Sequence, residues 1–148
     1  MIDDLDEAEA AVLRQVVGGL DLGRLDRLPH ISQHGDLVLN NFGCAERGKI
    51  IFDWEDFGRV TLPGFDVALM IYSCLRHDMA RIERLFETGQ PRHMGEILSH
   101  FCAGEADRDL FRRLLPIYYG AFQNLKSSLG YGDEIIGKCR RNILHHSG

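Results

Sequence analysis

The residues with the clearest chemical potential lie in the first half of the chain. The tripeptide His34–Asp36 reads HGD, Asn41 follows its acid by five residues, and Asp53 ends a hydrophobic run. Phosphoryl transfer depends on positioning and charge neutralisation more than on covalent catalysis. One carboxylate must reach the attacking hydroxyl, and carboxylate and amide oxygens must hold Mg²⁺. The spacing therefore predicts a hydroxyl partner in Asp36 and magnesium ligands in Asn41 and Asp53.

Short β-elements and a loop must position these side chains. Residues 41–44 and 49–53 favour two strands, joined by a turn at 45–48 that contains Gly48. Residues 36–41 are expected to form a loop, and residues 30–33 a further short strand. Gly35 permits a sharp turn beside Asp36. Asp53 is expected at the end of its strand, on a rigid support.

Helical periodicity dominates the rest of the chain. Asp4 and Glu7 have the spacing of a capping box, and the glycine pair at 18–19 marks a plausible stop for the first helix. Pro116 is expected to kink or split a long helix. The expected helices cover residues 4–20, a buried segment from 65 to about 75, and residues 79–88, 92–102, 107–129 and 133–144. The fold class is therefore mainly α (α+β), in a single domain over residues 1–148 with a small β-hairpin.

Composition excludes several classes of protein. The chain has 148 residues, of which 45% are hydrophobic and 26% charged, and its net charge is −5. No apolar run approaches the roughly 20 residues that span a bilayer, and the acidic N-terminus differs from a signal peptide. We therefore expect a cytoplasmic protein with no membrane partner. The negative charge argues against a nucleic-acid partner. The four cysteines form no CxxC pair and are interpreted as reduced, small hydrophobic residues.

The segments His34–Asn41 and Ile51–Asp56 together resemble the aminoglycoside phosphotransferase and choline kinase family of kinase-like enzymes. This resemblance implies the C-terminal lobe of the protein-kinase-like fold, with the hairpin next to the catalytic loop. It also implies ATP as phosphoryl donor, Mg²⁺ as cofactor and a small-molecule hydroxyl acceptor. In such a site Asp36 is the catalytic base or orients the hydroxyl, and the residues at Asn41 and Asp53 bind Mg²⁺ on ATP.

The same resemblance assigns supporting roles. Asp66, at the start of the buried helix, is expected to brace the catalytic loop as a structural residue, and His34 to shape that loop rather than carry protons. Glu55 and Asp56 could face substrate or a second metal ion. Residues 38–40 depart from the usual family pattern, which affects the expected substrate pocket rather than the metal ligands.

The family also has an N-terminal nucleotide-binding lobe, with a glycine-rich loop and a strand lysine. Only 33 residues precede His34, and they indicate a helix and a linker. The chain is therefore expected to be the catalytic lobe alone, truncated, and whether this lobe is active by itself is left open. A separate N-terminal lobe or a second copy of the chain is the expected partner. The alternative is a non-catalytic kinase-like module that binds a partner or self-associates.

A more remote alternative starts from His77 and Asp78, an adjacent pair typical of HD-type metal phosphohydrolases. Such enzymes add another His and another Asp, and here the companion His would have to be His30 or His34. The ordinary interpretation places Arg76 and His77 at the C-terminal end of a helix, where cations are favoured. The acidic stretch from Asp3 to Glu7 is interpreted as a solvated helix start, with attraction of a cationic substrate as the other option.

Overall fold

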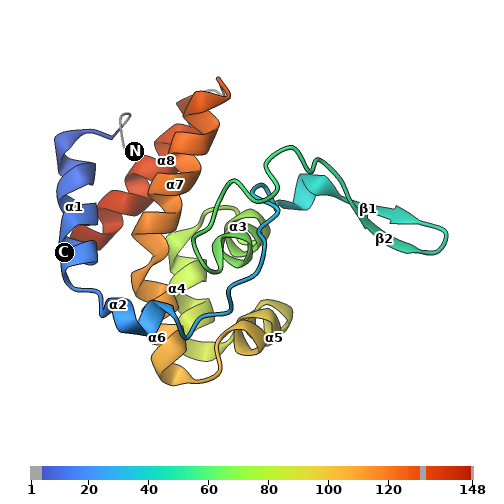
Figure 1. Cartoon of the computed structure of the whole chain (residues 1–148), viewed down its shortest axis with the longest axis horizontal. Helices are drawn as coiled ribbons and strands as arrows, with labels where there is room; N and C mark the ends of the chain where they lie inside the picture. The colour runs from blue at the N-terminus through green and yellow to red at the C-terminus, as the bar shows by residue number, and fades with distance from the viewer. Residues whose placement is uncertain (1–4, 131–132, 148) are drawn as a thin grey trace. The chain divides into compact units, whose positions relative to one another are not determined.

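The computed structural model describes residues 5–130 and 133–147. Within them the chain is mainly helical, with eight α-helices and one two-stranded antiparallel sheet (Figure 1). The predicted mainly α composition with a small β-element is confirmed. The described residues divide into two compact units, one drawn from residues up to Leu22 and from Asp109 onward, the other from Gly23–Arg108. The single domain expected from the sequence stays a prediction.

Three helices make up most of the first unit. They are α1 (Glu7–Gly18), α7 (Leu115–Ser128) and α8 (Asp133–Leu144), and each contacts the other two. Leu13 of α1 packs on Gly120 of α7, where an added Cβ would lie 3.0 Å from the leucine Cδ1. The small residue therefore permits close approach of these two helices. Buried apolar side chains on the three helices include Val12, Leu13, Tyr118, Tyr119, Phe122, Cys139 and Ile143.

Helix α1 begins later than the sequence predicts. Asp6 is its N-cap, because its side chain accepts the Glu9 N–H at 2.9 Å while the Glu9 carboxylate accepts the Asp6 N–H at 2.8 Å. This is a capping box with the same spacing as the predicted pair, of which Asp4 lies outside the described residues. Arg140 donates to both Asp6 and Glu9, which favours this register. The predicted glycine stop is confirmed.

Pro116 divides the long helical segment as predicted. Helix α6 (Glu105–Arg113) ends before Leu114, and α7 starts at Leu115 with the proline in its first turn. Proline is tolerated there because the first backbone N–H groups of a helix have no intrahelical acceptor.

The second unit contains α2 (Leu22–Leu25), α3 (Phe65–Cys74), α4 (Met79–Thr88) and α5 (Arg92–Phe101). Helix α5 contacts both α3 and α4. Helix α3 is buried on most sides, as its nearly continuous apolar sequence predicts. Its buried apolar residues are Phe65, Ala68, Leu69, Ile71 and Tyr72.

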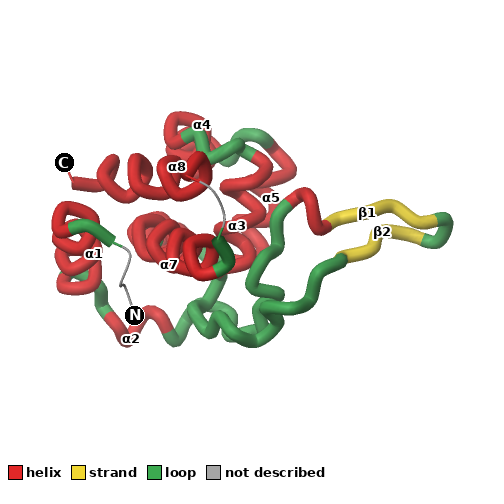
Figure 2. The backbone as a smooth tube through the Cα atoms, turned by 90° about the horizontal axis from the view of Figure 1, so that it is seen from above, coloured by secondary structure: helices red, strands yellow, loops and turns green. Residues whose placement is uncertain are grey.

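The predicted hairpin is present in the second unit. A 3-10 turn (Leu39–Asn41) leads into β1 (Phe42–Ala45), which pairs antiparallel with β2 (Gly48–Ile51). The register places Phe42 opposite Ile51. In both views the hairpin extends away from helices α3 to α5 of its own unit (Figures 1 and 2).

The strand predicted at residues 30–33 is wrong, because this segment has no regular secondary structure. Its backbone has other partners. Gln33 accepts the Gly58 N–H at its carbonyl at 2.9 Å, and its side-chain amide donates to the Ile31 carbonyl at 2.9 Å. Hydrogen bonds to a loop and to a side chain replace the ladder that a strand requires.

All four cysteines are free thiols, as predicted. Burial raises the pKa of Cys102 and that of Cys139 to about 12, so both are protonated and behave as small apolar side chains. In the part of the chain that the structure describes, no helix has the length and apolar character to cross a bilayer.

Candidate functional site

The HGD loop is fastened to the start of helix α3. The carboxylate of Asp66 accepts the backbone N–H of His34 at one oxygen and that of Gly35 at the other, the latter at 2.9 Å. In return, the Asp66 N–H donates to the side-chain oxygen of Gln33 at 3.0 Å. This N–H belongs to the first turn of α3, where no helical acceptor exists, so Gln33 completes the helix start.

Asp66 is buried, with 7% of its surface exposed. Burial raises the pKa of its carboxyl above the ordinary value, and the N–H groups of His34 and Gly35 oppose this effect. The carboxylate uses both oxygens on backbone donors of the loop. It is therefore placed to fix the loop backbone.

Gly35 has no acceptable replacement by a larger residue. Its φ is +89°, and an added Cβ would lie 2.7 Å from the carbonyl oxygen of Asp56. Both the left-handed backbone and the close approach require glycine. The turn at Gly35 therefore sets the backbone direction of the next residue, Asp36.

Both ring nitrogens of His34 are engaged by backbone groups. Nε2 lies 2.8 Å from the carbonyl oxygen of Phe52, and Nδ1 lies 3.3 Å from the backbone nitrogen of Asp36. The tautomer with its proton on Nε2 satisfies both contacts, since Nε2 then donates and Nδ1 accepts. The Trp54 ring lies against this imidazole, with 4.6 Å between ring centroids. His34 therefore ties the HGD loop to the segment that follows β2.

Asn41 lies against Asp36. Its side-chain nitrogen Nδ2 donates to the Asp36 carbonyl at 2.8 Å and lies 3.4 Å from Oδ2 of the same residue. Its backbone carbonyl accepts the Phe52 N–H at 2.9 Å. The structure thus brings together His34, Asp36 and Asn41. The backbone of Phe52 contacts both His34 and Asn41, and so places the next residue, Asp53, near them.

Asp53 lies two residues beyond the end of β2, not at the end of the strand as predicted. The Phe52 N–H still donates to the Asn41 carbonyl, in the register of the hairpin, but the ladder ends there because the Asn41 N–H donates to Val38 and the Phe52 carbonyl contacts His34. Asp53 has a φ of +58° and is exposed. Its side chain makes no hydrogen bond or ion pair with the described residues, so it is available to a ligand.

Glu55 and Asp56, grouped together by the sequence, differ in environment. Glu55 is exposed, whereas Asp56 is buried and accepts a hydrogen bond from Nη1 of Arg59 at 2.7 Å. One carboxylate oxygen of Asp56 is thus already paired with this guanidinium. The structure therefore leaves Glu55 the more accessible of the two.

Sequence reasoning missed two residues of this network, Gln33 and Phe52. A glutamine immediately before an HGD tripeptide was a detectable signal, because its side chain can satisfy a helix N-terminus. Phe52 acts through its backbone N–H and carbonyl, which any residue possesses, so its side chain carried no signal.

The His77–Asp78 pair has a local structural role. Asp78 is the N-cap of α4 and accepts the Arg81 N–H at 3.2 Å. His77 has a φ of +56° in the turn after α3, so the helix C-terminus predicted at this pair lies three residues earlier. Across residues 5–130 and 133–147, no three His, Cys, Asp or Glu side chains gather as a metal site would require. The magnesium ligands predicted from the sequence are Asn41 and Asp53. Asparagine is not one of these four residue types, so the finding does not test that prediction.

The acidic N-terminal stretch is only partly described, because Asp3 and Asp4 lie outside the described residues. Asp6 and Glu7 are engaged within the first unit: Asp6 pairs with Arg140 and Glu7 with Arg14.

Comparison of the chain with protein-family models, with curated proteins and with solved structures finds no match. The likeness to aminoglycoside phosphotransferases and choline kinases therefore rests on the residues of this site alone. We call its hydrogen-bonded residues the HGD network: Gln33, His34, Gly35, Asp36, Asn41, Phe52 and Asp66.

Proposed function

We propose that this chain is the catalytic lobe of an ATP- and Mg²⁺-dependent phosphotransferase that acts on a hydroxyl group of a small molecule. The observation that carries the proposal is the hydrogen-bonded link from Asp36 to Asn41. It places a carboxylate and an amide side by side, on a loop that Asp66 fixes from a buried helix. This is the arrangement expected of a base next to a metal ligand in phosphoryl transfer.

In this proposal Asp36 accepts the proton of the acceptor hydroxyl. The hydroxyl oxygen bonds to the γ-phosphorus of ATP as the bond between that phosphorus and ADP breaks. His34 and Asp66 position the base, because they accept the backbone N–H groups of Asp36 itself and of the preceding Gly35. Glu55 is the exposed acid that an acceptor could contact.

The side-chain oxygens of Asn41 and Asp53 are of the kind that binds Mg²⁺. Asn41 uses its side-chain nitrogen on Asp36, which leaves its Oδ1 without a hydrogen bond from the described residues. Asp53 adds an exposed carboxylate, and oxygen ligands of this kind suit Mg²⁺. The ion would neutralise charge on the phosphate oxygens when bound.

Metal binding is tested with Mn²⁺, a paramagnetic substitute for Mg²⁺, by two-dimensional NMR. Added Mn²⁺ should broaden the side-chain amide signal of Asn41 and the indole N–H signal of Trp54. Asp53→Asn should abolish this broadening because it removes the exposed carboxylate. Asp78→Asn is the matched control, since it alters an exposed acid of the same unit and keeps a good N-cap. Equal broadening in wild type and Asp53→Asn would contradict the proposed metal ligand.

The chemical step is tested with Asp36→Asn. The assay is run on the chain completed by a separate N-terminal nucleotide-binding lobe, with a panel of aminoglycosides, choline and homoserine as acceptors. Transfer from Mg²⁺–ATP should fall by roughly 10²–10⁴-fold in the variant, because the amide accepts no proton. Broadening by Mn²⁺ should persist in this variant, which separates loss of the base from loss of the metal site. Unchanged transfer would overturn the role of Asp36.

A second candidate function is a non-catalytic module that binds a protein partner or another copy of the chain. The observation that favours it is a group of exposed apolar side chains on β2 and after it, namely Ile50, Phe52, Trp54 and Phe57. Exposed apolar groups of this kind often mark interaction sites. Concentration-dependent association in sedimentation, combined with absence of Mn²⁺ and Mg²⁺–ATP binding, would favour this candidate over the enzyme.

A further inference from the structure

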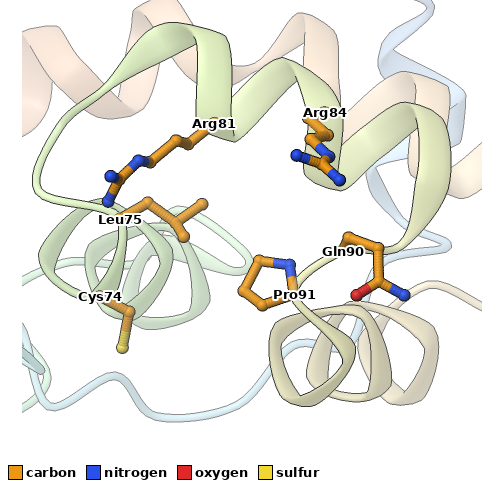
Figure 3. A pocket seen from close by; sticks show the side chains of 6 residues that line it. All are labelled: Cys74, Leu75, Arg81, Arg84, Gln90 and Pro91. Carbon is orange, nitrogen blue, oxygen red and sulfur yellow. The ribbon is translucent and has the colours of Figure 1, made fainter.

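A hollow lies on the second unit where α3 ends, α4 passes and α5 begins. Its volume is about 390 Å³, within the range of small-molecule pockets. Six residues line it: Cys74, Leu75, Arg81, Arg84, Gln90 and Pro91 (Figure 3). None of them belongs to the HGD network, so the inference does not rest on the proposed function.

Two arginines give this hollow a positive charge. Arg81 and Arg84 are three residues apart on α4 and share one helix face. Figure 3 shows the Arg81 guanidinium extended toward the Leu75 end of the hollow and that of Arg84 on the side of Pro91 and Gln90, so the two arginines flank it. Within the described chain the guanidinium of Arg84 makes no ion pair.

Arg81 is only weakly neutralised. Its Nε lies 3.6 Å from Oδ2 of Asp78, and both side chains are largely exposed. An exposed pair of this kind contributes little, so the terminal nitrogens of Arg81 can serve a bound anion. A local excess of positive charge in a chain of net charge −5 indicates recognition of an anion.

The rest of the lining is apolar or neutral. Leu75 is 5% exposed and supplies a buried apolar surface, and Pro91 adds another. Gln90 offers an amide that has no hydrogen bond with the described residues. Burial raises the pKa of the Cys74 thiol, so this side chain is neutral and does not repel an anion.

We propose that the hollow between α3, α4 and the start of α5 binds a phosphate monoester of a small apolar or aromatic group. A phosphate dianion matches two guanidinium groups, each of which donates in a planar fork. The apolar body would lie on Leu75 and Pro91 and lose contact with water there. Gln90 is placed to donate to a phosphate or ester oxygen.

The probe for this site is phenyl phosphate, titrated into the 148-residue chain without divalent metal and followed by two-dimensional NMR. Saturable shifts should appear at the signals of Leu75 and Gln90. Arg84→Gln and Arg81→Gln should each weaken binding at least about tenfold, since each removes a charge-assisted contact. Arg47→Gln is the matched control because Arg47 is exposed and makes no ion pair with the described residues. It should leave the affinity unchanged.

Two further probes distinguish the contribution of the apolar group to binding from that of the phosphate charge. Inorganic phosphate lacks the apolar body and benzoate lacks the second negative charge, so both should bind more weakly than phenyl phosphate. Unfolding in urea should be the same for wild type and Arg84→Gln, which excludes a folding defect. The proposal is overturned if Arg84→Gln binds as tightly as wild type, if no saturation occurs, or if the shifts lie away from Leu75 and Gln90.

Discussion

At the scale of single residues, the geometry of the candidate site depends on Asp66. Its two carboxylate oxygens accept the consecutive N–H groups of His34 and Gly35, which precede Asp36 in the chain. A buried backbone donor that loses its acceptor costs free energy comparable to its desolvation. Asp66 thus couples the stability of the second unit to the position of the proposed base.

Asp66→Asn should lower the free energy of unfolding by about 1–3 kcal/mol at neutral pH. The asparagine side chain has one oxygen, so either His34 or Gly35 would face an NH₂ group instead of an acceptor. Urea unfolding followed by circular dichroism measures the loss. Asp78→Asn changes another acid of the same unit, and its capping bond should survive, with a change below about 0.5 kcal/mol. Equal stability of Asp66→Asn and wild type would show that the carboxylate does not hold the loop.

At the scale of elements, the corner between α4 and α5 depends on two glycines. Gly89 ends α4 with a φ of +70°, and its N–H donates to the Leu85 carbonyl at 2.9 Å. Gly95 lies within α5, and an added Cβ there would be 2.2 Å from the Gly89 carbonyl oxygen. The added methyl group would collide with the backbone of Gly89, which has little freedom to move away.

Gly95→Ala should therefore destabilise the protein by about 1–3 kcal/mol, although alanine is the better helix former. The comparison is Gly137→Ala in α8, where the nearest atom to an added Cβ is the end of the Arg141 side chain, at 3.5 Å. This control should gain up to about 1 kcal/mol from helix propensity. Thermal unfolding of both variants measures whether each substitution lowers or raises the stability of the protein. Stabilisation by Gly95→Ala would mean that α4 and α5 separate at low cost.

At the scale of the whole molecule, one arginine joins the first and last helices. Nε of Arg140 on α8 donates to Oε1 of Glu9 at 2.7 Å, and its Nη2 donates to Asp6. Glu9 is fully buried, and its other oxygen accepts the Asp6 N–H. The two ends of the chain are thus connected through a buried carboxylate.

Arg140→Gln should lower the free energy of unfolding at pH 7 by more than the loss of an exposed ion pair does, because it leaves the buried Glu9 carboxylate without its cation. Arg14→Gln removes the exposed pair with Glu7 and should cost less than about 1 kcal/mol. Urea unfolding at pH 7 distinguishes the two. Similar losses in both variants would contradict the special role of Arg140.

The loss in Arg140→Gln should also depend on pH. The backbone N–H of Glu9 and then Arg140 hold the pKa of the Asp6 carboxyl below its ordinary value of 3.8. A lowered pKa stabilises the folded state above pH 3.8, and this contribution is lost as the pH falls through the folded-state pKa. The difference between wild type and Arg140→Gln should therefore shrink as the pH falls below 3.8. A difference independent of pH would exclude this electrostatic origin.

The sequence by itself determined the elements that local interactions specify. Helices α4 and α8 have the bounds that their periodicity predicted, Pro116 separates α6 from α7, and a turn at residues 45–48 joins the two strands. Spacing along one chain segment fixes which face of a helix is apolar, and a proline or a glycine acts on its immediate neighbours. His34, Asp36 and Asn41 could be named for the same reason, because they lie in one short segment of the chain.

Only the tertiary structure decided which partners those residues have. The capping box uses Asp6 because Arg140 approaches from α8, and the segment before His34 is no strand because Asp66 and Gly58 take its hydrogen bonds. The hollow lined by Arg81 and Arg84 likewise joins the end of α3 to the start of α5. These contacts connect residues far apart in the chain, and nothing in local spacing specifies them. Their formation depends on packing of whole helices, which brings each donor within about 3 Å of its acceptor.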